Sequence, residues 1–278
     1  MAPTGTLEGK VALITGAARG QGRSHAIRLA QEGADIIAVD LCQQIGSVAY
    51  PMATPEDLAQ TAEEVEALDR RIVTRQADVR DMAGLQAAVD AGIAELGPVD
   101  IVLANAGIAP QLNSDPHPDH EQAFRDVVEV NLFGVRNTVH AAVPSMIDKG
   151  QGGAIVLTSS TQGLTGRGGD GSGGMDGYAA AKHGVVGLMR TYANWLAEHR
   201  IRVNTVHPTG VRTPMVENDE MTAYMEANPG IAAALENLMP VEMVEAVDIS
   251  NAIAWLVSDS ARFVTGVTLP VDAGFTVK

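Results

Sequence analysis

A phenol and an amine that could exchange a proton lie one helical turn apart in this sequence. Tyr178 and Lys182 are separated by four positions, a spacing that puts both side chains on one face of a helix. A free tyrosine is almost fully protonated at neutral pH, because its pKa is roughly 10. It becomes a useful acid or base where a nearby cation stabilises its phenolate, and Lys182 is placed to do so. An ordinary surface tyrosine and lysine would show the same spacing.

A second chemical feature is a glycine-rich turn near the N-terminus, which reads Thr-Gly-Ala-Ala-Arg-Gly-Gln-Gly over residues 15–22. Between a strand and a helix, such a turn lets the backbone approach a pyrophosphate, which the helix N-terminal amides then face. The sequence therefore predicts a dinucleotide site. Its first contacts would come from Gly16, Arg19, Gly20, Gln21 and Gly22.

The end of the next predicted strand indicates which dinucleotide binds. Asp40 lies there, and a carboxylate at this place accepts hydrogen bonds from ribose hydroxyls and repels a 2′-phosphate. Arg19 favours the opposite preference, since a cation could pair with that phosphate, but Leu41 adds no second cation. We expect NAD as the cofactor. The alternative for Asp40 is a strand-end residue that only caps a turn.

The elements that must position these residues alternate along the chain. Apolar runs predict strands at residues 11–14, 35–40, 72–76, 100–104, 154–158, 202–206 and 267–271. Helical patterns cover about 23–32, 56–68, 82–96, 120–149, 178–199 and 246–258. This alternation predicts an α/β protein: a single-domain, Rossmann-like, doubly wound parallel sheet of about seven strands with flanking helices over residues 1–278.

Four long irregular stretches follow predicted strands or begin close to them, at residues 41–55, 108–119, 163–177 and 212–243. Ligands of open α/β sheets bind at the carboxyl ends of the strands, and loops of this length in a compact domain are more often functional than idle. Surface loops without a role are the alternative.

Charge and cysteine content exclude several classes of protein. The 278 residues include 34 acidic and 19 basic ones, for a formal charge of −15, which disfavours nucleic-acid and anionic-membrane binding. The single cysteine, Cys42, allows no intrachain disulfide and fits a reducing compartment. The sequence shows neither a signal peptide nor an apolar run long enough to span a bilayer. We expect a soluble, cytoplasmic protein without a metal centre, since its histidines are scattered and His117 and His120 lie in a polar loop.

Taken together, the motifs resemble the short-chain dehydrogenase/reductase family over nearly the whole chain. The motifs that carry the resemblance are residues 15–22, Asp78-Val79, Asn105-Ala106-Gly107, Asn131, Ser160, Tyr178 with Lys182, residues 208–213 and residues 271–274. Thr209 and Ala273 stand where the family commonly has glycine, and the spacing from serine to tyrosine is longer than usual.

The resemblance implies four catalytic residues. Tyr178 would be the acid or base, and Lys182 would lower its pKa and bind the nicotinamide ribose. Ser160 would orient the substrate oxygen, in preference to the adjacent Ser159. Asn131 would hold a proton-relay water through a local break in its helix, whereas from the residues alone it could be an ordinary polar position.

The predicted cofactor site also includes Leu41, Tyr178 and Lys182, and the resemblance extends it further. The residues that would meet the adenine are Asp78 and Val79. Those that would form the cofactor floor are Asn105, Ala106 and Gly107, and those that would bind the carboxamide are Val211 and Thr213.

Residues 40–58 resemble more closely the carveol-dehydrogenase-like, mycofactocin-associated branch of the family. Its members are thought to retain NAD tightly and to pass electrons to a peptide-derived redox partner. The insertion at 41–55 would then fold over the adenosine end of NAD, although a neutral insertion is the alternative. Cys42 would be a small buried filler.

Residues 212–243 are expected to form a substrate lid. Their methionines suit an adaptable apolar pocket, although these side chains could equally belong to the core; they are Met215, Met221, Met225, Met239 and Met243. We expect hydride transfer between NAD and an apolar secondary alcohol, a terpenoid such as carveol, or its ketone. The alternatives are a freely exchanging NAD(P)H-dependent ketone or 3-oxoacyl reductase and a non-catalytic dinucleotide sensor. The family further implies a homotetramer with the 178–199 helix at one interface.

Overall fold

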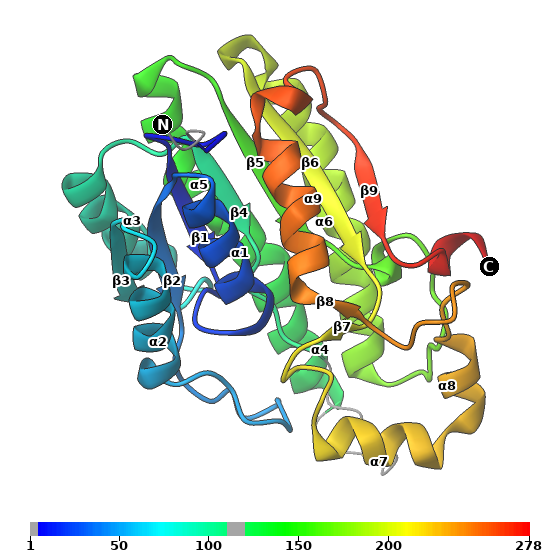
Figure 1. Cartoon of the computed structure of the whole chain (residues 1–278). Helices are drawn as coiled ribbons and strands as arrows, with labels where there is room; N and C mark the ends of the chain where they lie inside the picture. The colour runs from blue at the N-terminus through cyan, green and yellow to red at the C-terminus, as the bar shows by residue number, and fades with distance from the viewer. Residues whose placement is uncertain (1–4, 110–119) are drawn as a thin grey trace.

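The computed structural model describes residues 5–109 and 120–278. Within these residues, seven parallel strands form one sheet in the order β3-β2-β1-β4-β5-β6-β9 (Figure 1). The strands are β1 (Val11–Thr15), β2 (Asp35–Asp40), β3 (Ile72–Gln76), β4 (Ile101–Ala104), β5 (Gly153–Thr158), β6 (Ile201–Pro208) and β9 (Thr268–Val271). The strand order reverses between β1 and β4, so the prediction of a doubly wound sheet is confirmed.

Helices cover both faces of the sheet. One face carries α1 (Gly20–Gln31), α2 (Pro55–Glu66) and α9 (Ala246–Val257); the other carries α3 (Met82–Leu96), α5 (Gly134–Lys149) and α6 (Gly173–Leu196), with α4 (His120–Val128) packed on α6. Short 3-10 turns lie at η2 (Thr161–Gly163), η3 (Ala197–His199), η4 (Asp259–Ala261) and η5 (Phe275–Val277). In the part of the chain that the structure describes, no helix is long and apolar enough to cross a membrane.

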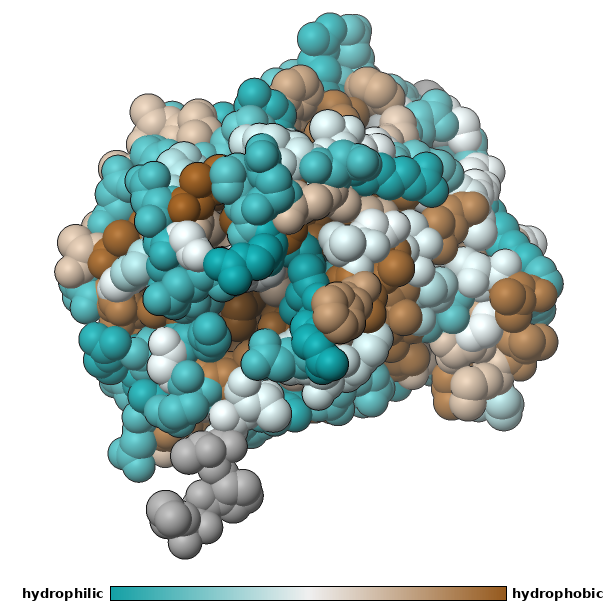
Figure 2. Space-filling view, turned by 90° about the horizontal axis from the view of Figure 1, so that it is seen from above, coloured by the Kyte–Doolittle hydropathy of each residue, from teal (hydrophilic) through white to brown (hydrophobic). Residues whose placement is uncertain are grey.

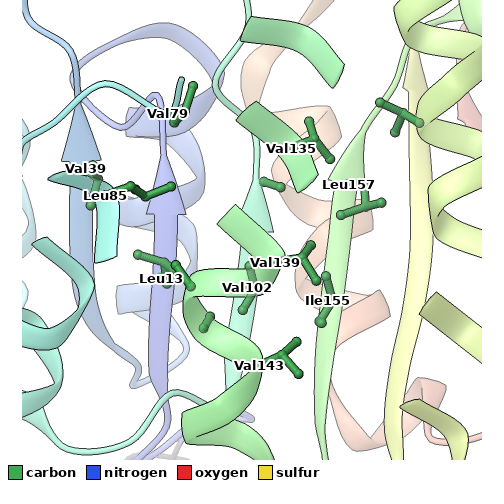
Figure 3. Close-up of a cluster of buried hydrophobic side chains, with 14 of the residues drawn as sticks. Leu13, Val39, Val79, Leu85, Val102, Val135, Val139, Val143, Ile155 and Leu157 are labelled. Carbon is green, nitrogen blue, oxygen red and sulfur yellow. The ribbon is translucent and has the colours of Figure 1, made fainter. Parts of the chain in front are cut away.

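Two apolar cores lie on the two sides of the sheet. Along β1, Leu13 belongs to one core, whereas Ala12 and Ile14 belong to the other, because successive side chains of a strand point to opposite faces. Figure 3 shows the first core, where Leu13 lies near Val102, and Val139 of α5 lies beside Ile155 of β5. Burial on both faces explains why the strands read as continuous apolar runs.

Helix α6 begins at Gly173, five positions before the predicted start at Tyr178. Close packing against α4 explains the difference. A Cβ atom at Gly173 would lie 2.1 Å from the His120 carbonyl oxygen, and one at Gly177 would lie 3.0 Å from that of Phe124. The glycines that suggested a loop therefore allow two helices to approach each other.

The single helix predicted over residues 120–149 is interrupted. A π-helical turn, η1 (Glu129–Phe133), separates α4 from α5. Such turns are rare and are frequent at functional sites.

Residues 212–243 are less irregular than predicted. They contain α7 (Asp219–Ala227) and α8 (Pro229–Ala234), and a small parallel pair, β7 (Val211–Arg212) with β8 (Val244–Glu245), joins the two ends of the segment. In Figure 1, α7 and α8 lie below the sheet, at the end where the strands finish. Figure 2 shows the molecule from above, at the opposite end, where hydrophilic residues cover much of the surface with apolar ones between them.

Candidate active site

The glycine-rich turn is shaped by two close backbone approaches. Gly16 has a φ of 69°, and a Cβ atom there would lie 2.8 Å from the Ala106 Cα atom. A Cβ atom at Gly22 would lie 1.9 Å from the Gly16 carbonyl oxygen. No side chain larger than hydrogen fits at either position, so the turn brings the N-terminus of α1 directly to the end of β1.

The N-terminus of α1 is free to bind an anion. Its N-cap residue, Arg19, makes no side-chain capping bond, and the first turn contains no acidic residue. The first amides of a helix lack intrahelical partners and carry a positive dipole end. They face a pocket rather than a capping side chain, as a pyrophosphate-binding turn requires.

Most of the residues predicted to bind the cofactor line this one pocket. They are Gly16, Arg19, Gly20, Gln21, Gly22, Asp40, Leu41, Asp78, Val79, Asn105, Ala106, Gly107 and Thr213. The other three, Val211, Tyr178 and Lys182, line a narrower pocket that shares Gln21, Asn105, Gly107 and Thr213 with the first. The two pockets therefore form one continuous cleft.

Asp40 is fixed at the wall of the cleft. One carboxylate oxygen accepts a hydrogen bond from the Ala18 amide at 3.0 Å, and the other accepts one from the Cys42 amide at 3.1 Å. Arg19, the rival determinant of cofactor choice, donates instead to the Pro51 carbonyl. The carboxylate thus faces the cleft, while the guanidinium is occupied by the 41–55 segment.

The 41–55 segment forms part of the wall of the same cleft. Ile45 and Tyr50 are buried and line the pocket beside Asp40. The Tyr50 hydroxyl accepts a hydrogen bond from the Ala109 amide at 3.2 Å, and Ser47 donates to Asp126 of α4 at 2.5 Å. The segment is therefore packed against the body of the protein at two separate places.

The environment of the single cysteine makes its thiol unreactive. Cys42 is buried, and burial, followed by the neighbouring Asp40 carboxylate, raises the pKa of its thiol to about 12. Because the thiolate is the reactive form, the structure agrees with the interpretation of Cys42 as a filler. Within the described residues, no group of histidine, cysteine, aspartate and glutamate side chains is arranged to hold a metal ion. His117 and most of the 108–119 stretch lie outside these residues.

Ser160, Tyr178 and Lys182 converge in the narrow pocket. The Lys182 ammonium donates to the Thr158 carbonyl oxygen at 2.8 Å and lies 5.6 Å from the centre of the Tyr178 ring. Ser160 begins the η2 turn, where its hydroxyl oxygen accepts a hydrogen bond from the Gln162 amide at 3.2 Å. Ser159 points elsewhere and donates to the Lys182 carbonyl oxygen, so the structure favours Ser160 of the two.

Burial governs the protonation of this group. Burial raises the pKa of Tyr178, and a hydrogen bond with Ser160 only partly opposes it. Burial also lowers the pKa of Lys182 to about 8. Loss of solvent around the phenol is the largest cause of the rise in the Tyr178 pKa, and the expected stabilisation of the phenolate by Lys182 stays a prediction.

Asn131 lies in the π-helical turn and is fully buried. Its side-chain amide accepts a hydrogen bond from the Ile108 amide at 2.8 Å and donates one to the Ile108 carbonyl at 2.9 Å. A Cβ atom at Gly107 would lie 3.2 Å from Asn131 Oδ1 and 3.7 Å from Lys182 Nζ. The residue thus joins the helix break to the floor of the catalytic pocket.

A wide pocket of about 1040 Å³ opens on the other side of Tyr178 and Ser160, beneath α7 and α8. All five methionines of residues 212–243 line it, and none is fully buried. Met215 also packs against the apolar core, whereas the other four line the pocket without belonging to either core. Met215 lines all three pockets. The pocket also has an acidic lining of Glu217, Asp219, Glu226, Glu236 and Glu242.

Sequence reasoning missed two residues of this pocket. Tyr224 of α7 is buried and donates a hydrogen bond to Asp170 Oδ2 at 2.8 Å, which ties the lid to the glycine-rich 163–177 stretch. Phe275 comes from the C-terminal segment and lies under the Arg167 guanidinium at 5.2 Å. A tyrosine inside a methionine-rich segment was a signal for the first, whereas no local pattern indicated the second.

Known proteins that are similar to this chain identify its family. A family model described as short chain dehydrogenase matches residues 10–223. An uncharacterized oxidoreductase of Mycobacterium tuberculosis is 57% identical, over 98% of each chain. A (-)-trans-carveol dehydrogenase of Rhodococcus erythropolis is 49% identical, over 98% of this chain and 99% of the relative. The crystal structure of a carveol dehydrogenase from Mycobacterium avium in complex with NAD is 50% identical, with a TM-score of 0.91 over 99% of this chain and 100% of that one.

Proposed function

Since the chain belongs to the short-chain dehydrogenase family, we propose that it transfers hydride between NAD and an apolar secondary alcohol or the matching ketone. One observation carries the proposal. Ser160 and Tyr178 line both the narrow pocket, which continues into the dinucleotide cleft, and the wide methionine-lined pocket. A substrate oxygen between them would meet a hydroxyl donor and a phenol at the junction of the two sites.

NAD fits the cleft for reasons of charge and shape. The uncapped N-terminus of α1 suits the pyrophosphate, and the fixed Asp40 carboxylate suits a ribose with two free hydroxyls. The carveol dehydrogenase of Mycobacterium avium has NAD in its structure, which supports the same choice.

Ser160, Tyr178 and Lys182 each have a separate task in alcohol oxidation. Bound NAD supplies the hydride acceptor. Ser160 donates a hydrogen bond to the substrate oxygen, while the Tyr178 phenolate takes the hydroxyl proton. Lys182, whose ammonium keeps free protons besides the one given to Thr158, stabilises that phenolate and contacts the nicotinamide ribose. Because burial raises the pKa of Tyr178, we expect the rate of oxidation to rise with pH as the phenolate forms.

The wide pocket favours a neutral substrate, for which a terpenoid alcohol such as carveol is the model. Flexible thioethers accept irregular apolar shapes. The carboxylates of the lining repel anions, and the Arg212 cation is paired with Glu217 and Glu245. These charges disfavour the rival 3-oxoacyl reductase, whose substrates travel on acidic carriers. The rival sensor has no need of Ser160, Tyr178 and Lys182 together.

The first test is to denature protein purified without added cofactor and to identify any released dinucleotide by mass. Stoichiometric NAD or NADH would support tight retention behind the 41–55 segment, with an external redox partner. An empty protein would favour a freely exchanging dehydrogenase, and NADP would contradict the role of Asp40.

The second test is turnover. We expect (-)-trans-carveol or another neutral cyclic alcohol to be oxidised with NAD, and a ring of the same size bearing a carboxylate to be a poor substrate. Binding of NAD without turnover of any alcohol or ketone would favour the sensor. The link to mycofactocin and the homotetramer through α6 stay predictions, and sedimentation of the purified protein checks the second.

A further inference from the structure

A buried histidine links β6 to the residue that we assign as the substrate-orienting serine. His207 and Thr205 lie two positions apart on β6, and both are fully buried. The Thr205 hydroxyl lies 2.8 Å from His207 Nε2, and His207 Nδ1 lies 2.8 Å from the carbonyl oxygen of Ser160. No role in cofactor or substrate contact accounts for this arrangement, because neither His207 nor Thr205 lines any of the three pockets.

The partners assign the hydrogens of the imidazole. A carbonyl oxygen can only accept, so Nδ1 must carry a proton. Burial lowers the pKa of His207 to about 4, partly opposed by the hydrogen bond with the Ser160 carbonyl; the nearby Lys182 lowers this pKa further, and Asp272 raises it. The ring is therefore neutral, and its Nε2 accepts the Thr205 proton. The chain of donors runs in one direction, from Thr205 through His207 to Ser160.

Ser160 is held at two points by this arrangement. His207 fixes its carbonyl oxygen, and the Gln162 amide donates to its hydroxyl oxygen at 3.2 Å. The backbone is extended at Ser160, with φ −167° and ψ 165°, and both anchors act on this one residue. The hydroxyl proton is not used in the Gln162 bond, so it can be donated to the Tyr178 oxygen or to a substrate oxygen.

We propose that His207 is a positioning residue for the reaction, which holds the Ser160 hydroxyl in line with Tyr178 through the Ser160 carbonyl. The proposal rests on the proposed function, because it presumes that Ser160 orients the substrate oxygen. Thr205 fixes the tautomer that makes His207 a donor at Nδ1. Small displacements of an orienting group slow the chemical step more than they weaken binding.

The test measures the rate of hydride transfer in a single turnover with NAD and (-)-trans-carveol. The KM for this alcohol is measured alongside. We expect His207→Leu to slow transfer roughly 10- to 100-fold with KM changed by less than about threefold. His207→Asn keeps a donor near the Nδ1 position, and the freed Thr205 hydroxyl can turn to the Val267 carbonyl, 3.4 Å away. This variant should recover most of the lost rate. Equal losses in the Leu and Asn variants, or a rate unchanged in both, would overturn the proposal.

Asn204 gives a matched control for a merely structural effect. It lies on the same strand, is 1% exposed, and bonds to the Val264 carbonyl and the Val267 amide at 2.9 and 3.1 Å. As the neighbour of Thr205 it faces the other side of the sheet. Asn204→Ala should lower the melting temperature while leaving hydride transfer intact. A loss of transfer in this variant equal to that of His207→Leu would assign the His207 effect to general destabilisation and overturn the proposal.

A double-mutant cycle with Ser160→Ala separates the inference from the function on which it rests. If His207 acts through Ser160, His207→Leu has no further effect on transfer once the hydroxyl is gone. Full additivity of the two losses would sink the inference while leaving the proposed function in place. A Ser160→Ala enzyme with wild-type transfer would instead refute the role given to Ser160, and the inference with it. Thr205→Val, which removes only the tautomer-fixing donor, should give a smaller loss than His207→Leu and is expected to fold even where the Leu variant does not.

Discussion

The two halves of the cleft are built from different material. The dinucleotide half consists of glycines, backbone amides and the Asp40 carboxylate at the ends of β1, β2 and β4. The substrate half consists of side chains on α7 and α8, with flexible methionines and a hydrogen bond between Tyr224 and Asp170. A ligand of fixed shape can be recognised by rigid backbone, whereas varied substrates require side chains that adapt. Substitutions in the two halves should therefore change different kinetic constants.

The largest effect is expected at the junction of the halves. Tyr178→Phe removes the proton acceptor without altering either pocket, and we expect kcat/KM to fall by about 10²- to 10⁴-fold. NAD affinity, measured by fluorescence titration, should stay unchanged. Tyr192→Phe, a buried tyrosine on the same helix, is the control and should keep full activity. A folded Tyr178→Phe enzyme that keeps most of its activity would refute the mechanism.

A change confined to the dinucleotide half should alter cofactor choice alone. Asp40→Ala removes the charge that repels a 2′-phosphate, and we expect the NADP-to-NAD ratio of kcat/KM to rise by about 10- to 100-fold. The KM for the alcohol should not move. If the alcohol KM changes as much as the cofactor preference, the two halves are not independent.

Lys182→Met tests the cost of the buried cation at the junction. Burial lowers the pKa of Lys182 to about 8, from an ordinary lysine value of 10.5. The unfolded chain therefore binds more protons between these pH values, so the burial penalty is complete below about pH 8 and fades as the pH rises toward 10.5. We expect the inactive variant to exceed wild type in unfolding free energy by roughly 1–3 kcal/mol at pH 7.

Urea unfolding at pH 7 and pH 10 checks this prediction, since the stability difference between the two proteins should shrink at the higher pH. A variant that is less stable than wild type at pH 7 would mean that the Lys182 bond to Thr158 outweighs the burial penalty.

A change confined to the substrate half should be milder. Tyr224→Phe removes the hydrogen bond to Asp170 that ties the lid to the 163–177 stretch. A hydrogen bond to a charged group stabilises by about 1.5–3 kcal/mol when buried, but Asp170 is partly exposed, so we expect only a threefold to tenfold rise in the alcohol KM. Asp170→Asn should act in the same direction, and NAD affinity should be unaffected in both. A fall in KM would show that the bond hinders substrate entry instead.

The smallest effect is expected at Ala273, which has a φ of 48° where the family commonly has glycine. An L-residue in this left-handed conformation is strained by about 1 kcal/mol, partly offset by the greater freedom of an unfolded glycine. Ala273→Gly should thus raise the unfolding free energy by less than about 1 kcal/mol, with unchanged activity in both halves. A lower unfolding free energy for Ala273→Gly than for wild type, measured by chemical denaturation, would contradict the inferred strain at Ala273.

The sheet could be predicted because its signals are local. Each strand is a short apolar run, since helices bury both of its faces. The dinucleotide half was equally visible, because its glycines follow a local pattern: Gly22 is required by its contact with Gly16 within the turn, and Gly16 has a positive φ. The glycines at 173 and 177 were misread, because they face α4, a helix distant in sequence, and only the folded protein shows that they allow close packing.

The substrate half was harder to predict for the same physical reason. The side chain of Asn218 caps α7, which begins at Asp219, and α8 begins at Pro229. Both are recognisable start signals, but the helices are short and their apolar residues line a pocket instead of a core. The link from His207 to Ser160 joins β6 to the turn that follows β5, 47 positions earlier in the sequence. No pattern within either segment indicates that contact.

The central place of β1 in the sheet has a consequence for synthesis on the ribosome. This first strand pairs with β2 and β4, so the three strands that carry the dinucleotide half can pair once residue 104 has emerged, before the rest of its lining is made. The apolar edge of β4 then stays unpaired until β5, which ends at residue 158, has been synthesised. At translation rates of about 5–20 residues per second, that edge stays unpaired for roughly 3–10 s. An unpaired apolar strand edge is a template for aggregation, so slow elongation over residues 105–158 is expected to lower the yield of soluble protein more than slow elongation later in the chain.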